Sequence, residues 1–212
     1  PPTSAEILND LGSARLATGD FKSAISVLEN AIELAPDLAM AHANLGTALA
    51  YRGDIGTPLR AFLRATQLAP KNHRIWLKMG RALLNQGHTE TAEKCFRRIL
   101  QFRPENIGAR AALGALLERN GQYEEALELL QPLIDADTQD TNAVVAWATT
   151  CNRLGRAEDA IPVLQKYIDR PLSRPEYALL SHCLGDLYEK TNDYEYAFRA
   201  HEEANAKSRE LF

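Results

Sequence analysis

The pattern of apolar and polar positions in this chain repeats every 34 residues. Three matching stretches, IELAP, TQLAP and LQFRP, end at Pro36, Pro70 and Pro104. Glycines keep the same spacing in two series: Gly12, Gly46, Gly80 and Gly114, then Gly19, Gly53, Gly87, Gly121 and Gly155. A fixed period of this length is typical of a solenoid built from helix–turn–helix units, which offers a surface for binding.

Each repeated position has a structural role. The second glycine series suits a helix C-terminal cap with positive φ, and the prolines end the second helix of each unit. In the first half of each second helix a small residue is followed four positions later by a large one, which fills the space between helices. These pairs are Ala24 with Leu28, Pro58 with Phe62, Ala92 with Phe96, Ala126 with Leu130, and Ala160 with Leu164. The pattern predicts twelve helices, with turns near residues 19, 53, 87, 121, 155 and 192.

The repeated residues resemble the tetratricopeptide repeat (TPR). The third unit matches the pattern best, through Trp76, Met79, Gly80, Leu83, Gly87, Ala92, Phe96, Ile99 and Pro104. The resemblance implies an all-α, right-handed TPR superhelical solenoid that forms a single domain over 1–212. The expected units are 5–38, 39–72, 73–106, 107–140, 141–174 and 178–211.

The pattern weakens toward the C-terminus. Thr138 replaces the proline of the fourth unit, Ala148 replaces the first glycine of the fifth, and the register shifts by three residues across 170–175. The segment from Tyr194 to Phe212 has no turn signal, so we expect one long capping helix. Its expected core side chains are Tyr194, Ala197, Phe198 and Ala204, and its expected solvent-facing ones are Glu202, Glu203, Lys207 and Glu210.

Three prolines carry local predictions. Pro132 and Pro162 fall inside second helices, where a missing N–H and a steric clash should bend the helix. Pro58 should lie in the first turn of its helix, after Asp54 or Thr57 as the cap.

Composition indicates a soluble helical domain. The 212 residues are 45% hydrophobic and 25% charged, with a formal net charge of −4. No apolar run approaches the ~20 residues of a membrane span, and the first residues lack the features of a signal peptide. The acidic residues concentrate in the second half, which argues against nucleic-acid binding. The three cysteines form no Cys-x-x-Cys pair and indicate reduced thiols, so we expect a cytoplasmic protein.

No residue pattern points to catalysis. The five histidines have no metal-ligand spacing, and the glycines never cluster into a phosphate-binding loop. Cys183 lies beside His182, but neighbouring helical residues point about 100° apart and do not form a pair. We therefore expect no catalytic, cofactor-binding or metal-binding residues, and no enzyme in this segment.

The TPR resemblance implies that the first helix of each unit lines a concave groove. The groove stripe is basic in its centre and acidic at both ends. The candidate peptide-binding residues are Asn44, Tyr51, Arg74, Lys78, Arg81, Arg119 and Arg153. Such a stripe is either a solvated basic face or a site for a protein or peptide partner with acidic or carboxylate groups.

Two TPR subclasses suggest how such a groove could bind a peptide. The subclass that clamps the acidic tail of heat-shock chaperones is half matched, by Asn44, Arg74 and Lys78, whereas Asn9 and Ser13 depart from it. The subclass that captures peptide backbone with an asparagine ladder retains only Asn44 here.

A second resemblance covers about thirty residues at the C-terminal end. The stretches LGDLYEK, DYEYAF and ANAK look like the last repeat of bacterial TPR–sulfotransferase fusions. This resemblance implies a longer enzyme with its catalytic domain elsewhere. We expect a protein-interaction module or scaffold that binds an extended or helical segment; the alternative is the substrate-recruiting part of a TPR–sulfotransferase.

Overall fold

A computed structural model describes residues 4–54 and 56–209, and the side chains as far as residue 206. The described residues form α-helices joined by turns, without a strand, so the all-α prediction is confirmed. The helices are α1 (Ser4–Ala17), α2 (Phe21–Leu34), α3 (Ala39–Arg52), α4 (Thr57–Leu68), α5 (His73–Asn85), α6 (Thr89–Phe102), α7 (Ile107–Arg119), α8 (Tyr123–Asp135), α9 (Thr141–Arg153), α10 (Ala157–Ile168), α11 (Arg174–Lys190) and α12 (Tyr194–Arg209). Every helix in these ranges is too short or too polar to span a bilayer.

The chain divides into two compact units, Pro1–Ala109 and Arg110–Phe212. The first contains α1 to α6, the second contains α8 to α12, and the division falls within α7. A single domain over 1–212 therefore remains a prediction. Its ends at 1–3 and 210–212, and the last two residues of the expected unit 178–211, lie outside the described residues.

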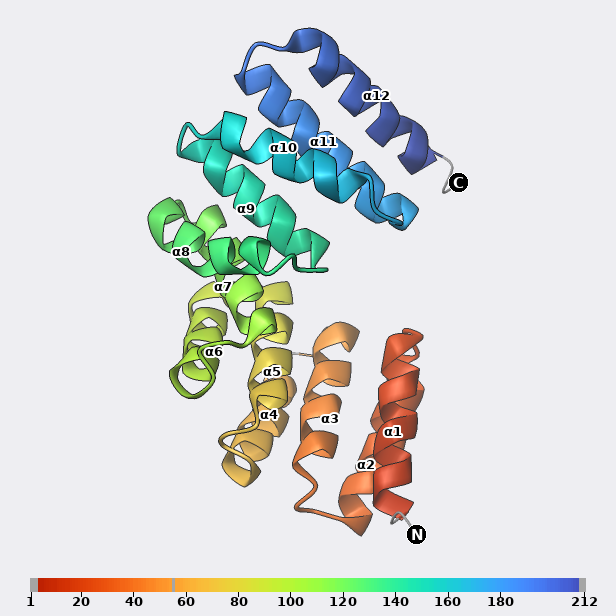
Figure 1. Ribbon diagram of the computed structural model, residues 1–212. Coiled ribbons are helices and arrows are strands. Elements are labelled where there is room, and N and C mark those ends of the chain that lie inside the picture. The colour runs from red at the N-terminus through yellow and green to blue at the C-terminus, as the bar shows by residue number, and fades with distance from the viewer. Residues whose placement is uncertain (1–3, 55, 210–212) are drawn as a thin grey trace. The chain divides into compact units, whose positions relative to one another are not determined.

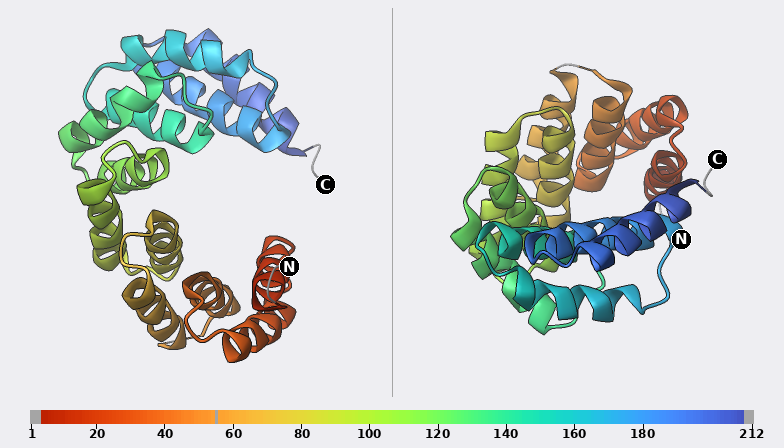
Figure 2. Two further views of the ribbon diagram at one scale, coloured as in Figure 1. Left: turned by 60° about the horizontal axis from the view of Figure 1, so that its bottom comes forward. Right: turned by 90° about the horizontal axis from the view of Figure 1, so that it is seen from above.

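In the first unit, consecutive helices pack as pairs: α1 with α2, α3 with α4, and α5 with α6. The first helices also contact one another, α1 with α3 and α3 with α5 (Figure 1). The left view of Figure 2 shows α1, α3 and α5 along the inner side of this unit and their pair mates α2, α4 and α6 along its outer side. The first helices of the pairs thus share one face of this unit.

The second unit repeats this packing in its last pairs. α9 contacts α10 and α11, and α11 contacts α10 and α12. Figure 1 shows α12 lying along α11.

Left-handed residues make the turns within the pairs. Gly19, Gly53, Gly87, Gly121 and Gly155 have φ between 73° and 92°. In the last pair Asn192 takes this place with φ of 67°, because asparagine tolerates the left-handed region better than most side chains. All six predicted turns are confirmed.

The proline turns between pairs are held by side-chain hydrogen bonds that recur with the repeat. Trp76 donates its Nε1–H to the carbonyl oxygen of Pro70 at 2.9 Å. His42, one period earlier, places Nε2 2.9 Å from the carbonyl oxygen of Pro36. The His42 side chain therefore has a hydrogen-bonding partner within the fold.

A close contact recurs in the pairs, where a glycine of the first helix faces a large residue sixteen positions later. A Cβ built on the glycine would lie 2.4 to 2.9 Å from that residue, so only hydrogen fits. The contacts are Gly12 with Leu28, Gly46 with Phe62, Gly80 with Phe96, Gly114 with Leu130, and Gly185 with His201. The last contact places a histidine where the others place an apolar side chain.

The proline predictions have mixed outcomes. Pro58 lies in the first turn of α4, as predicted, but the cap is Gly56, which makes no side-chain cap bond, so the prediction of Asp54 or Thr57 as cap is wrong. Asp54 instead accepts hydrogen bonds from the side chains of Arg52, at 2.8 Å, and Thr57, at 3.4 Å, so its carboxylate does not cap a backbone N–H of α4. Pro132 and Pro162 lie inside α8 and α10, and a bend there remains a prediction.

The last pair also departs from expectation. α11 begins at Arg174, ahead of the expected boundary at 178, because Ser173 and Glu176 close a capping box.

On α12, Ala197 and Ala204 are buried as expected, but Tyr194 and Phe198 are 66% and 69% exposed, so their core assignment is wrong. Small residues bring α12 close to α11, and the two rings fall outside that narrow contact. The expected solvent-facing Lys207 and Glu210 lie outside the residues whose side chains are described.

Candidate functional site

Three basic side chains project from one face of α5. Arg74, Lys78 and Arg81 are three or four residues apart, so they are neighbours on the helix surface. Arg74 and Arg81 are exposed, whereas Lys78 is half-buried between them. Helix geometry therefore places the three cations on one side of α5.

Lys78 is electrostatically strained. Burial, and then the charges of Arg74 and Arg81, lower the pKa of its ammonium group. Within the described ranges, no carboxylate forms an ion pair with any of the three side chains. This basic face, defined as Arg74, Lys78 and Arg81, therefore holds positive charge that no carboxylate of the described residues neutralises by an ion pair.

The start of α5 adds to this positive potential. Its first turn contains no acidic residue, although the helix dipole favours a negative charge there. Burial lowers the pKa of His73, and the nearby charges of Arg103 and Arg74 lower it further. Asn72 caps the helix by accepting a hydrogen bond from the Arg74 backbone N–H at 3.1 Å. An anion beside this turn would meet favourable charge from several directions.

The side chain of Asn44, on α3, is buried where α3 packs against α1. Its side chain is 2% exposed, and its Nδ2 donates to Asn9 Oδ1 at 2.9 Å. Its Oδ1 is buried without a hydrogen-bond partner. The Asn44 amide can therefore reach a ligand only after it releases Asn9 and turns outward.

Tyr51 lies at the end of α3 and is 51% exposed. Its ring stacks on Phe21 at a centroid distance of 5.4 Å, and Asn85 donates to its hydroxyl oxygen at 3.1 Å. The aromatic ring is thus held in place while one side stays open to solvent.

The remaining two candidates, Arg119 and Arg153, lie in the second unit at the ends of α7 and α9. Burial raises the pKa of Glu118, and the charges of Arg153 and Arg119 partly oppose this rise. These two arginines therefore face a carboxylate of their own unit, unlike the basic face of α5.

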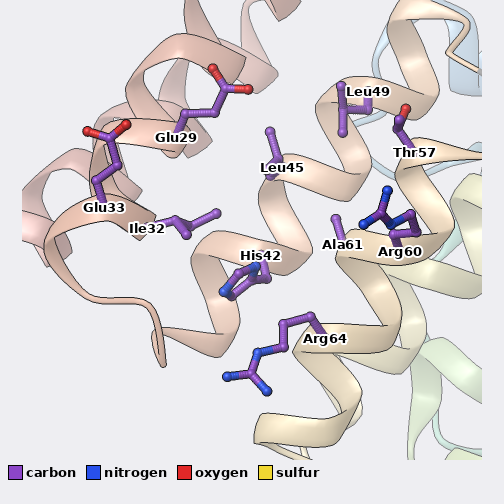
Figure 3. A pocket seen from close by; sticks show the side chains of 10 residues that line it. All are labelled: Glu29, Ile32, Glu33, His42, Leu45, Leu49, Thr57, Arg60, Ala61 and Arg64. Atoms are coloured by element: carbon purple, nitrogen blue, oxygen red, sulfur yellow. The ribbon is translucent and has the colours of Figure 1, made fainter.

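A cavity of about 600 Å³ lies elsewhere in the first unit, between α2, α3 and α4. Figure 3 shows Glu29 and Glu33 on its α2 side and Arg60 and Arg64 on its α4 side. The apolar floor is formed by Ile32, Leu45, Leu49 and Ala61. The sequence analysis considered only the first helices, whereas the two charged walls of this cavity belong to the second helices α2 and α4. The i, i+4 pairs Glu29–Glu33 and Arg60–Arg64 are the sequence signal that could have indicated it.

The cysteines are unsuited to nucleophilic chemistry. Burial raises the pKa of Cys95 and Cys151 to about 11 and that of Cys183 to about 12, so the thiols stay protonated at neutral pH. The side chain that the structure does bring to His182 is His201, on the next helix, with the two Nδ1 atoms 3.1 Å apart. No motif in the sequence signals that pair.

The helix pairs, glycine turns and packed first helices define a TPR-type solenoid, and the comparisons agree. A tetratricopeptide-repeat family model matches residues 9–73. A second family model, described as the middle TPR-like domain of cilia and flagella-associated protein 70, matches residues 60–205, more than half of the chain. The chain belongs to this TPR-like family. No curated protein matches it.

Solved structures share the fold. PilW, described as a widely conserved type IV pilus biogenesis factor, is 19% identical with a TM-score of 0.79, and the match covers 97% of this chain and 94% of PilW. PilF of Pseudomonas aeruginosa is 18% identical with a TM-score of 0.76 and coverage of 96% and 97%. MamA from Desulfovibrio magneticus RS-1 is 24% identical with a TM-score of 0.68 and coverage of 81% and 96%. At these identities the likeness shows the fold alone.

Proposed function

We propose that this chain is a protein-interaction scaffold that captures an acidic segment of a partner protein on the basic face of α5. The observation that carries the proposal is Lys78, which is half-buried between Arg74 and Arg81 and forms no ion pair with a carboxylate among the described residues. Like charges at this spacing repel one another, and a bound carboxylate would remove that repulsion. TPR-type solenoids commonly act through such surfaces.

The chemistry of the face fits a carboxylate-bearing peptide. A charged hydrogen bond is worth roughly 1.5–3 kcal/mol, and partial burial of Lys78 reduces screening by water. Tyr51 offers an exposed ring to an apolar side chain of the same segment. An extended or helical segment could use both contacts. Asn44 joins only if it releases Asn9, and Arg119 and Arg153 remain candidates within the second unit.

We assign no catalytic residue, cofactor or nucleic-acid partner to this segment. We also propose that it is located in the cytoplasm. The excess of acidic residues in the sequence, with 28 Asp and Glu against 24 Lys and Arg, supports a protein partner over a nucleic acid. The three buried free cysteines fit a reducing compartment.

Affinity capture with three baits tests the proposal. The wild-type chain is compared with Arg74→Ala/Lys78→Ala, which removes two charges from the basic face. The control, Arg60→Ala/Arg64→Ala, removes the same charge at the same i, i+4 spacing from the cavity side of α4. Quantitative mass spectrometry of the captured proteins gives the recovery with each bait.

We expect the α5 variant to lose a partner that the wild type and the α4 control both retain. The captured protein should contain an acidic segment, and its recovery should fall as salt rises. Equal recovery with all three baits would contradict the proposal, and selective loss with the α4 variant would move the site to the cavity.

A second candidate function is recruitment of a substrate within a longer TPR–sulfotransferase. The observation that favours it is the outward side of α12, where Tyr194 and Phe198 are exposed. A helix that ends a solenoid usually presents a polar outer face, so these rings fit a further element packed over them. The test is the gene itself, because a reading frame that continues past Phe212 into a sulfonate-donor-binding domain would support this function, and one that stops there would exclude it.

A further inference from the structure

A cluster of metal-ligand side chains lies where α12 packs on α11. His182 and Asp186 are one turn apart on α11, and His201 comes from α12. One ligand atom from each residue lies within 4.8 Å of the other two. We propose that His182, Asp186 and His201 bind a divalent transition-metal ion, and that Zn²⁺ fits best.

The position of His201 departs from the repeat. In the other close helix contacts a leucine or phenylalanine faces the glycine of the first helix, as Leu130 faces Gly114. Here the His201 ring faces Gly185, and a Cβ on that glycine would lie 2.5 to 2.7 Å from ring atoms. The missing side chain at 185 allows the imidazole to lie against α11. Its packing fixes the ring before any ion binds, which favours binding.

The two histidines already have the separation that a shared ion requires. Their Nδ1 atoms are 3.1 Å apart, with ring centroids 4.9 Å apart. Two imidazole nitrogens bound to one tetrahedral zinc at 2.0–2.1 Å lie about 3.3 Å from each other. Little movement of either ring is therefore needed for both nitrogens to coordinate.

Carboxylates complete the cluster. Asp186 Oδ1 lies 3.7 Å from His201 Nε2, and the Asp186 side chain is half exposed, so it can rotate toward an ion held by the histidines. Glu189 Oε1 lies 3.4 Å from the same Nε2. A histidine that binds metal through one nitrogen usually donates the N–H of the other to a carboxylate, and Glu189 is placed for this positioning role.

The ligand set determines the kind of ion. Two imidazoles and one carboxylate suit Zn²⁺ and neighbouring transition metals, whereas Mg²⁺ and Ca²⁺ prefer all-oxygen sites. Three protein ligands leave a fourth position for water. Because the ligands come from two helices, a bound ion would tie α12 to α11 and stabilise this pair.

Titration calorimetry of the untagged chain with zinc chloride tests the site. We expect one ion per chain. Loss of an outer-shell partner costs roughly 10–100-fold in metal affinity, so loss of a direct ligand should cost at least about 100-fold. The variants are His201→Leu, His182→Ala and Asp186→Asn, and Glu189→Gln should show a smaller loss. The control is His88→Ala, which removes an exposed histidine from the first unit.

Two further readouts separate coordination from misfolding. Circular dichroism checks each variant, and His182 is exposed, so its removal should leave the helices intact. Cobalt(II) added to the wild type should give a visible absorption that zinc removes and that is absent in His201→Leu. The proposal is overturned if the wild type binds no zinc, or if zinc affinity is unchanged in His201→Leu or His182→Ala.

Discussion

The α5–α6 pair and the α11–α12 pair share one packing device and use it differently. In both, a glycine of the first helix faces a ring sixteen residues later. Phe96 is fully buried against Gly80, whereas His201 keeps 23% of its side chain exposed against Gly185. The apolar ring serves stability alone, and the polar ring brings a ligand atom to the surface. A position that is fixed by packing can therefore carry chemistry once its residue type changes.

The two pairs also differ in how charge is balanced. On α5, Lys78 and its arginine neighbours have no acidic partner within the described chain, which favours an anionic ligand from outside. On α11 and α12, His201 lies near both Asp186 and Glu189, which favours a cation. The same helical scaffold thus presents one surface that favours an anion and another that favours a cation.

The largest expected effect comes from breaking the α5–α6 contact. In Gly80→Leu the new Cβ would lie 2.4 Å from Phe96, and overpacking of this kind costs roughly 1–3 kcal/mol. Urea unfolding measures the loss of stability. Hydrogen exchange should rise first in α3 to α8, because repeats depend on their neighbours.

A natural pair in the second unit supplies the control. Ala148 and Leu164 occupy these repeat positions in α9 and α10, and both are fully buried. Gly80→Ala combined with Phe96→Leu copies that pair and should be more stable than Gly80→Leu. Unchanged protection in Gly80→Leu would show that the repeat register is wrong.

A smaller effect of opposite sign is expected when the polar contact is made apolar. His201→Leu gives α12 the residue that α2 and α8 carry at this position, Leu28 and Leu130, both fully buried. Added apolar burial should outweigh the exposed ion pairs that are lost, for a gain of about 1 kcal/mol without metal. Thermal unfolding in the presence of a chelator measures it, and a clear loss of stability would mean that the histidine is itself a structural contact.

The smallest expected effect concerns pH and the turn between α8 and α9. Hydrogen bonds from Lys166 and Arg170 lower the pKa of Asp137, which has φ of 55°. Because the folded pKa is depressed, its contribution is present above the ordinary aspartate value of about 4 and is lost as pH falls through the lower folded value.

Asp137→Asn removes the charge and keeps a residue that tolerates this backbone. The variant should melt slightly below the wild type at pH 7, and the two should converge in acid. A difference that persists at low pH would assign the effect to the backbone.

Much of this fold could be predicted from the sequence because the repeat specifies local events. Gly87 permits a positive φ in a turn, and Pro104 ends a helix. Both effects involve only the backbone within a few residues, so the sequence alone can predict them. The same holds for Arg74, Lys78 and Arg81, whose neighbourhood follows from helix geometry.

Contacts between helices could not be predicted in this way. The burial of Asn44 and its bond to Asn9 depend on how closely α3 approaches α1. The meeting of His182 with His201 depends on the register of α12 along α11. The exposure of Phe198 has the same origin, because the sequence pattern leaves open which side of an apolar helix a neighbour covers.

We propose above that the basic face of α5 binds a carboxylate-bearing partner. The most direct measurement is titration calorimetry of the captured partner's acidic segment with wild type, Arg74→Ala/Lys78→Ala and Arg60→Ala/Arg64→Ala, at low and high salt. We expect the α5 variant to bind about tenfold more weakly or worse, as loss of a charged hydrogen bond requires, and the α4 control to bind as wild type. Salt should weaken the wild type more than the α5 variant. Equal affinity of the wild type and the α5 variant would contradict the claim.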